Sequence, residues 1–500
     1  MILSKGNLGN IKTGKVIVPQ DAMFNLPEKV LQFGTGVLLR GLPDFFIDKA
    51  NRNGVFNGRI VVVKSTSNGG TADFERQDNL YTLCVRGFEN GKAIEENVIC
   101  SAISRVITAE SDWKSILEFA KNPDLKIIIS NTTEVGIVLI KERINQNPPV
   151  SFPAKLLAVL FERYQQFENS MEGNLVVIPT ELLPDNGKKL EAIIRELAVF
   201  NELGEGFMAW LNLNVEFCNS LVDRIVPGKP DQATLDALEK ELGYQDNLLS
   251  MVEPYSLWAI EGGEKVASLL SFSQTDTGVV VTNDIERYRE LKVRLLNGTH
   301  TLSCGIAVLS GIDTVKNGMA DEKLKSYIKA VMLQEIGPAI PYEIEKAEKL
   351  AFTDTVLDRF ANPYIEHLWI NITVQYTMKM KLRILPVLIN YYKINHTLPK
   401  HIAFGFAAYL LFMRSEEKNG KYYGYFNEKQ YLINDDSAVY FNEKLQSSAT
   451  DEDYLIQVFD DIDFWGLDFK TLPGFTTAVG DYYVKIKQTE IKEAFSSFLV

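Results

Sequence analysis

Three polar residues on one predicted helix carry the side chains that carbonyl reduction requires. Lys292, Asn297 and His300 lie in the stretch Glu290–His300. At about 100° per residue, they fall within a sector of about 140° on one helix face. A lysine ammonium can protonate a developing alkoxide, an amide can stabilise that oxygen, and an imidazole can bind a neighbouring hydroxyl. On spacing alone, a solvated helix face with an incidental histidine is the simpler interpretation.

A glycine lies inside this predicted helix, at position 298. Glycine in a helix interior costs about 1 kcal/mol relative to alanine, so its presence needs a reason. We therefore expect another group to approach the backbone closely at Gly298.

A second motif with possible chemistry is a glycine-containing turn after the predicted strand Val30–Phe33. Gly34 permits a tight turn, and Gly36 would let backbone N–H groups approach a pyrophosphate at a helix N-terminus. The third small residue of the dinucleotide fingerprint is replaced by Leu39, and Pro43 indicates a kink or a late helix start. An ordinary strand–helix turn remains an alternative.

The end of the next predicted strand, Arg59–Lys64, bears on the choice of cofactor. NAD-binding folds often place an acidic residue there to hold the ribose diol. This chain has Lys64, followed by Ser65 and Thr66. A lysine there could pair with a 2′-phosphate, whereas the two hydroxyls could bind a free ribose. The residues therefore leave NADH and NADPH both open.

The elements that position these motifs change character along the chain. Short β-branched runs alternate with helical stretches, which predicts a parallel sheet in an α/β domain. The predicted strands are 30–33, 59–64, 126–130 and 174–178, and the predicted helices are 38–50, 112–120 (with Ser111 as N-cap) and 155–168. We assign residues 1–281 to this domain.

The second half has long helical patterns and almost no strand signals between residues 282 and 411. Helices are predicted at 284–309, 321–335, 341–352 and 363–380, while the tyrosine-rich segment 416–448 receives no assignment. The predicted fold class is therefore an α/β N-terminal Rossmann-like domain (1–281) with a mainly α-helical C-terminal domain (282–500).

Composition narrows the classes of function. The chain has 500 residues, 46% hydrophobic and 23% charged, which is typical of a folded globular protein. Its net charge of −13 argues against a nucleic-acid binder, although a local cluster of cations can still bind a small anion. The longest apolar run, 402–413, is shorter than the roughly 20 residues of a membrane span, so we expect a buried core helix.

The expected location is the cytoplasm, because the first residues have no apolar signal-peptide core. The four cysteines and four histidines show no metal-ligand spacing, so no metal is expected. The oligomeric state stays open.

Three motifs together resemble the mannitol dehydrogenase family of polyol-specific long-chain dehydrogenases. They are Lys-x4-Asn-x2-His from Lys292, the Val-Asp-Arg-Ile signature within 217–227, and the loop 32–40. The similarity runs from about residue 28 to the C-terminus. It implies a Rossmann-type fold, NAD (NADH) as cofactor and no metal. The implied cofactor-binding residues are Phe33, Gly34, Thr35, Gly36, Arg40, Lys64, Asn131 and Thr132.

The same resemblance assigns catalytic roles. Lys292 matches the general acid/base, whose pKa would have to fall by about 2–3 units through burial. Asn186 and Asn297 match the two amides of an oxyanion site, and His300 matches a ligand of a substrate hydroxyl. Asp223 would position Lys292 or a hydroxyl, with structural pairing to Arg224 as an alternative.

Further stretches resemble the branch of the family that acts on hexuronates. They are 130–136, 151–156, 178–182, 359–365 and 379–386. The implied reaction is the reversible, NADH-dependent reduction of D-tagaturonate to D-altronate, with a small hexuronate as substrate. The alternatives are reduction of fructuronate, oxidation of a polyol such as mannitol, or a non-catalytic dinucleotide sensor.

A uronate carries a carboxylate, so its pocket needs a cation. Arg359 is the first choice, because its planar guanidinium can bind a carboxylate through two hydrogen bonds. Lys379 and Arg383 are the next candidates. All three could instead be surface charges or partners in ion pairs between helices.

Overall fold

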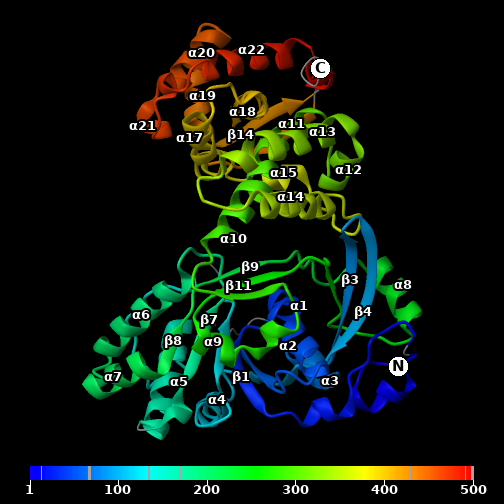
Figure 1. Cartoon of the computed structure of the whole chain (residues 1–500), viewed down its shortest axis with the longest axis vertical. Coiled ribbons are helices and arrows are strands. Elements are labelled where there is room, and N and C mark those ends of the chain that lie inside the picture. The colour runs from blue at the N-terminus through cyan, green and yellow to red at the C-terminus, as the bar shows by residue number, and fades with distance from the viewer. Residues whose placement is uncertain are drawn as a thin grey trace. The chain divides into compact units, whose positions relative to one another are not determined.

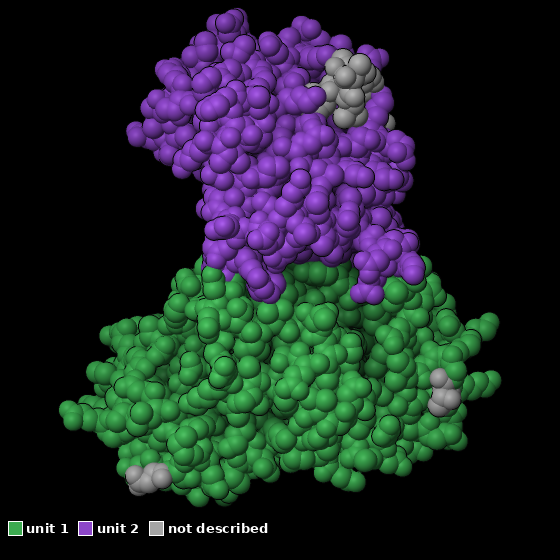
Figure 2. Space-filling model, in the orientation of Figure 1, with its two compact units in different colours: residues 1–87, 93–285 green, residues 88–92, 286–500 purple. Residues whose placement is uncertain are grey.

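The computed structural model describes residues 1–12, 14–65, 69–132, 136–168, 170–426, 429–489 and 491–496 (Figure 1). The chain forms two compact units (Figure 2). Unit 1 contains residues 1–87 and 93–285, and unit 2 contains residues 88–92 and 286–500.

Unit 1 is built on a six-stranded parallel sheet with the order β5-β2-β1-β6-β7-β8. Taken along the chain, this is the 3-2-1-4-5-6 order of the Rossmann fold, which confirms the predicted class of this domain. The strands are β1 Glu28–Phe33, β2 Arg59–Lys64, β5 Ile103–Thr108, β6 Ile127–Ser130, β7 Leu175–Pro179 and β8 Val215–Phe217.

Both faces of this sheet are buried, which explains why its strands read as continuous apolar runs. Alternate residues of β1 enter different cores: Val30 packs with residues of α2, and Leu31 packs with residues of α4 to α7. Figure 1 shows α5, α6 and α7 grouped beside β7 and β8. The helices of unit 1 are α1 Val37–Gly41, α2 Pro43–Arg52, α3 Ala72–Arg76, α4 Trp113–Ala120, α5 Phe152–Phe167, α6 Asn186–Phe200, α7 Gly204–Asn214, α8 Gln232–Leu242 and α9 Glu264–Leu269.

Two three-stranded sheets complete the strands of unit 1. One has the order β10-β3-β4 and the other β12-β11-β9. Their bounds are β3 Tyr81–Glu89, β4 Lys92–Cys100, β9 Ser220–Asp223, β10 Ser250–Val252, β11 Leu257–Glu261 and β12 Val279–Thr282. Residues 88–92, which include the end of β3 and the start of β4, belong to unit 2.

The four predicted strands are confirmed as β1, β2, β6 and β7. The single helix predicted at 38–50 is wrong, because the chain breaks at Leu42 (φ −134°, ψ −81°). Pro43 then begins α2, in the first-turn position where its missing N–H does no harm. The N-cap of α4 is Asp112, which accepts from the Ser115 N–H, and not Ser111.

Unit 2 is mainly helical, as predicted. Its α-helices are α10 Glu286–Glu290, α11 Thr299–Leu309, α12 Val315–Ala320, α13 Glu322–Ala330, α14 Lys346–Phe360, α15 Trp369–Ile372, α16 Tyr376–Lys379, α17 Leu385–Ile394, α18 Lys400–Phe412, α19 Ala438–Ser447, α20 Asp451–Phe459, α21 Ile462–Trp465, α22 Phe475–Gln488 and α23 Ile491–Ser496. Helix α18 is buried over nearly its whole length, which confirms the core helix predicted at 402–413. Among the described residues, no helix combines the length and apolar character needed to cross a membrane.

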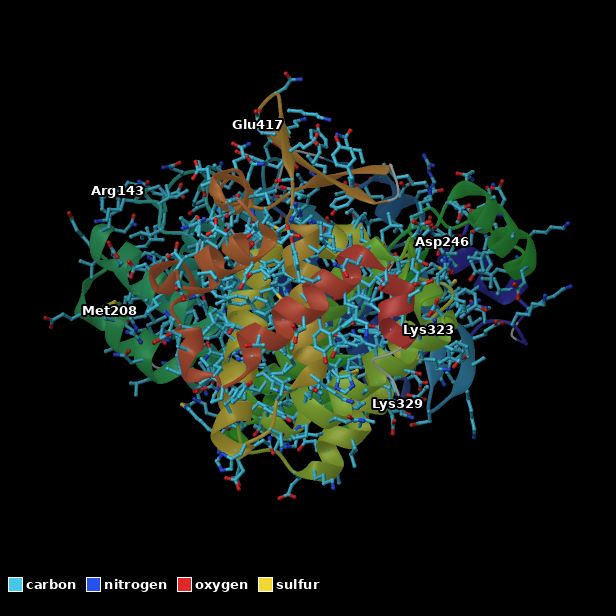
Figure 3. All side chains as sticks on the ribbon, turned by 90° about the horizontal axis from the view of Figure 1, so that it is seen from above. Arg143, Met208, Asp246, Lys323, Lys329 and Glu417 are labelled. Atoms are coloured by element: carbon cyan, nitrogen blue, oxygen red, sulfur yellow. The ribbon has the colours of Figure 1, made fainter. Side chains whose placement is uncertain are left out.

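Three stretches in the described part of unit 2 are π-helices, a feature that was not predicted from the sequence. They are η5 Leu291–Gly298, η6 Val331–Ile336 and η8 Met380–Ile384. The segment left without assignment forms the antiparallel sheet β13 Glu416–Lys418, β14 Lys421–Phe426 and β15 Lys429–Ile433, followed by α19. Figure 3 shows Glu417 at the outer tip of this sheet.

Candidate active site

Lys292 and Asn297 lie on the π-helix η5, between α10 and α11. Both residues are half-buried. Because a π-helix has wider turns than an α-helix, the 100° spacing used for the sequence prediction is wrong for this stretch. Single π-turns inside α-helices occur frequently at functional sites, so the local structure marks the same stretch as the residue types do.

His300 lies in the first turn of α11 and is buried, with 8% of its surface exposed. Its ring stacks on Phe360 of α14 and meets the rings of His367 and Trp369 edge-on. Its Nε2 atom has no hydrogen-bond partner among the described residues. A buried ring nitrogen without a partner is a group that a substrate hydroxyl could satisfy.

The three cations predicted to bind a carboxylate all influence the charge state of His300. Burial lowers the pKa of His300 well below 6.5, and His367, Arg359, Arg383 and Lys379 lower this pKa further. Every charged group in that set is basic. Burial and these positive charges therefore favour the neutral imidazole, and the same positive charges would favour binding of a sugar carboxylate nearby.

Each of these cations is positioned by a different element. Arg359 is buried near the end of α14. Lys379, the last residue of α16, donates to the Ile372 carbonyl at 2.9 Å. Arg383 of η8 donates to Thr301 Oγ1 at 3.1 Å, and burial lowers its pKa to about 10. The alternative of exposed surface charges is wrong for Arg359, which is 6% exposed.

His367 belongs to the same cluster but was missed by the sequence prediction. The centroids of the His367 and His300 rings lie 5.2 Å apart. Burial lowers the pKa of His367, and the charge of Lys379 lowers this pKa further. It has no motif spacing to His300, so only the fold brings the two histidines together. The one available signal was that the chain has just four histidines.

The close approach expected at Gly298 is absent. A Cβ built there would meet Ile384 Cδ1 and Val293 O at 3.5 Å, which is ordinary van der Waals contact. The glycine is not required by packing at this position.

Asn186, predicted as an oxyanion amide, is the first residue of α6 and is fully buried. Its Nδ2 donates to the carbonyls of Pro179, Glu181 and Ser220, and its Oδ1 accepts from the N–H groups of Ser220 and Gly187. Both polar atoms of the Asn186 amide are therefore hydrogen-bonded to backbone groups. These bonds connect the end of β7 to the start of β9.

Asp223 is the last residue of β9 and is buried. The neighbouring Arg224 donates to the carbonyls of Glu253 and Gly41 and lies over the Phe45 ring. These contacts account for Arg224 without Asp223, so they do not support the alternative in which the two residues pair.

The predicted cofactor loop has the geometry that a phosphate requires. Gly34 has φ +129°, and a Cβ there would lie 2.9 Å from both Asn131 O and Leu39 Cδ1. Gly36, the N-cap of α1, is exposed, and a Cβ there would meet nothing within 4 Å. The strand, the glycine turn and the open helix N-terminus together fit a dinucleotide pyrophosphate.

Other predicted cofactor residues surround this turn. Thr35 is half-buried beside it, whereas Phe33 packs edge-on against Phe152 in the core. Arg40 is buried and donates to the Leu248 carbonyl. Phe33 and Arg40 therefore support the loop from inside the protein.

The ends of β2 and β6 supply the remaining predicted positions. Lys64 ends β2 and is buried, and the Oγ of Ser65 has no hydrogen-bond partner among the described residues. Thr66 lies outside the described residues. Asn131 donates to Thr180 Oγ1 at 3.0 Å, and Thr132 donates to Glu181 Oε1 through both its N–H and its hydroxyl.

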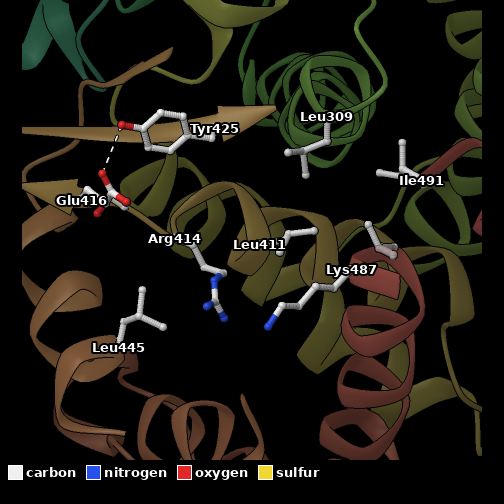
Figure 4. Close-up of a pocket in the computed structure, with 10 residues that line it drawn as sticks. Leu309, Leu411, Arg414, Glu416, Tyr425, Leu445, Lys487 and Ile491 are labelled. Carbon is white, nitrogen blue, oxygen red and sulfur yellow. Dashed lines mark hydrogen bonds between the residues drawn. The ribbon is translucent and has the colours of Figure 1, made fainter. Parts of the chain in front are cut away.

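A separate pocket of about 430 Å³ lies between the ends of α18 and α22 (Figure 4). Arg414 and Lys487 are on its wall, and both donate to Asp451. It contains none of the residues predicted for catalysis, and its cations are offset by a carboxylate. We therefore do not assign the site to it.

Comparison with known proteins covers nearly the whole chain. A mannitol dehydrogenase Rossmann domain model matches residues 28–274, and a mannitol dehydrogenase C-terminal domain model matches residues 284–487. Altronate oxidoreductase of Halalkalibacterium halodurans is 37% identical over 483 residues, which are 95% of this chain and 94% of that protein. Altronate oxidoreductase of Bacillus subtilis is 36% identical over 479 residues, 95% of this chain and 96% of the relative.

Two solved structures share the fold. Pseudomonas fluorescens mannitol 2-dehydrogenase, in ternary complex with NAD and D-mannitol, has a TM-score of 0.69 at 21% identity and covers 100% of this chain and 99% of its own. A substrate-free D-sorbitol dehydrogenase has a TM-score of 0.79 at 19% identity, with coverage of 99% and 100%.

Proposed function

The chain belongs to the mannitol dehydrogenase family, and from this premise we propose that it is an altronate oxidoreductase. It reduces D-tagaturonate to D-altronate with NADH, reversibly. The observation that carries this substrate class is the group of Arg359, Lys379 and Arg383 around a neutral His300. The carboxylate of a uronate would be attracted by this positive charge, whereas a neutral polyol carries no charge that it could attract.

In this mechanism the residues of η5 act on the keto oxygen. Bound NADH supplies the hydride that the carbonyl carbon receives. The Lys292 ammonium gives its proton to the oxygen, which becomes the new hydroxyl, and the Asn297 amide donates a hydrogen bond to the same oxygen. In the oxidative direction, neutral Lys292 takes that proton back.

The remaining residues orient the sugar acid. His300 Nε2 is buried and has no hydrogen-bond partner among the described residues, so we assign a substrate hydroxyl to it; the neutral ring allows that atom to accept or donate, depending on the tautomer. Arg359 holds the carboxylate, with Lys379 and Arg383 adding positive charge. Asp223 is assigned to a substrate hydroxyl or to the orientation of Lys292.

NADH is the preferred cofactor in this proposal, although β2 ends in a lysine. The buried Ser65 hydroxyl has no hydrogen-bond partner among the described residues, which supports a bond to a ribose hydroxyl without a charge requirement. A single lysine is also a weaker phosphate clamp than an arginine. The comparison to make is kcat/KM with NADH and with NADPH at fixed tagaturonate; a preference for NADPH of about tenfold would assign Lys64 to the 2′-phosphate.

The substrate is tested by NADH oxidation with D-tagaturonate, D-fructuronate and D-fructose, and by NAD reduction with D-mannitol. We expect the highest kcat/KM with tagaturonate. A preference for fructuronate would identify the protein as a fructuronate reductase. A preference for fructose or mannitol would identify a polyol dehydrogenase. No turnover with any of these substrates would indicate a dinucleotide sensor.

A further inference from the structure

One buried arginine joins the two π-helices that carry the proposed site. Arg294 lies on η5, two residues after Lys292, and is 8% exposed. Its Nε and Nη2 donate to the two carboxylate oxygens of Glu290, each at 2.9 Å. Its Nη1 donates to the carbonyl of Leu382 at 2.6 Å and to that of Arg383 at 3.2 Å. A single guanidinium thus connects η5 to η8.

The sequence of η8 explains why a carbonyl there accepts from another helix. Four residues after Leu382 is Pro386, at the start of α17, and proline has no N–H to donate. An α-helical i→i+4 bond from residue 386 to the Leu382 carbonyl is therefore impossible, and the Arg294 guanidinium donates to this carbonyl. The carboxylate of Glu290 accepts from the other two guanidinium nitrogens, Nε and Nη2, which fixes the orientation of the Arg294 side chain.

Arg383 of η8 connects the same two helices in the opposite direction. It donates to Thr301 Oγ1 at 3.1 Å and to the Asn297 carbonyl at 3.4 Å. The two helices are therefore bonded in both directions, by Arg294 from η5 to η8 and by Arg383 from η8 to η5. Lys292 and Asn297 lie on one of them, and Arg383 on the other.

We propose that Arg294, held by Glu290, is a positioning residue for the reduction of sugar acids. It fixes the spacing between the helix that protonates the keto oxygen and the helix that adds charge for the carboxylate. All three nitrogens of its guanidinium are used within the protein, so it acts through Lys292, Asn297 and Arg383. The inference rests on the proposed function, because only a substrate with a carboxylate needs both helices at once.

The test is Arg294→Met in the full-length enzyme, with kcat and KM for tagaturonate and Kd for NADH measured separately. We expect kcat to fall and KM to rise, each by about tenfold or more, because both ends of the substrate lose their alignment. The Kd for NADH should stay within about twofold, since the cofactor loop lies in unit 1. A purely structural role would reduce the active fraction, which lowers apparent kcat and leaves KM unchanged; that result would overturn the proposal.

Two further variants keep the test decisive. Glu290→Gln retains the shape of the side chain and should shift kcat and KM in the same directions as Arg294→Met, by a smaller factor. If both constants of Glu290→Gln equal those of wild type, the proposal is overturned, even if Arg294→Met does not fold. Arg195→Met removes another Arg–Glu pair at i,i+4 spacing, on α6, and should change neither constant. A wild-type chain inactive on tagaturonate would overturn the proposed function and this inference together, whereas active wild type with unaltered variants removes only the role of Arg294.

Discussion

The imidazole of His300 stacks on the ring of Phe360, with centroids 4.1 Å apart and planes 9° from parallel. Phe360 is the last residue of α14 and directly follows Arg359. The stack therefore holds the neutral imidazole beside the helix that provides the proposed carboxylate ligand. The stack covers one face of the ring, and Nε2 at the ring edge has no hydrogen-bond partner within the described part of the chain.

This environment predicts how pH affects stability. The folded-state pKa of His300 lies well below the 6.5 of the unfolded chain, so the unfolded state binds more protons as pH falls through that value. The stabilising contribution is therefore present above about pH 6.5 and is lost progressively below it. We expect the Tm of wild type to fall more between pH 7.5 and 5 than that of His300→Gln. The control is His396→Gln, at an exposed position, which should follow wild type; a wild-type slope shared by His300→Gln would contradict the assignment.

Lys292→Ala should remove the proton donor and leave the cofactor site intact. We expect kcat to fall by about 10²–10⁴-fold, because the lysine acts only as the alkoxide develops. The Kd for NADH, measured by fluorescence titration, should stay near wild type. A variant that keeps more than about a tenth of wild-type kcat would show that Lys292 is not the general acid.

Arg359→Leu should raise KM for tagaturonate far more than KM for an uncharged keto sugar. Leucine leaves the substrate carboxylate without its charge-assisted partner, whereas a neutral sugar loses no such contact. The measurement is KM for both substrates in parallel. Equal effects on the two would mean that Arg359 is structural, and the same comparison would then be made with Lys379→Met.

Two glycines of the cofactor loop should respond differently to the same change. Gly34→Ala combines a positive φ with a contact of 2.9 Å to a backbone carbonyl, so it should cost about 1–3 kcal/mol of stability as well as NADH affinity. Gly36→Ala meets nothing in the protein, so it should keep the wild-type Tm and weaken NADH binding alone. Thermal unfolding and NADH titration separate these effects; unchanged NADH affinity in Gly36→Ala would remove the phosphate from this turn.

The sequence predicted the elements that depend on local patterns. The strands β1, β2, β6 and β7 are buried on both faces, so their apolar runs were clear. The residue types at 292, 297 and 300 indicated the stretch proposed for catalysis, but its π-helical geometry was not predicted, because an i→i+5 pattern leaves no distinct apolar period.

Contacts between residues far apart in the sequence could not be predicted from the sequence. His367 reaches His300 only through the packing of separate helices. The Asn186 Nδ2 group donates to carbonyls that lie 5–34 residues away in the sequence, and no motif spacing reveals these partners. The helix break at Leu42 was indicated by Pro43, although its position came only from the structure.

The central claim is that the chain reduces the keto group of D-tagaturonate with NADH. The most direct test follows NADH absorbance with purified protein and tagaturonate, and identifies the product by NMR. We predict one D-altronate formed per NADH consumed, with kcat/KM at least about tenfold above that for fructuronate. Absence of altronate, or higher kcat/KM with fructuronate or a neutral keto sugar, would contradict the account.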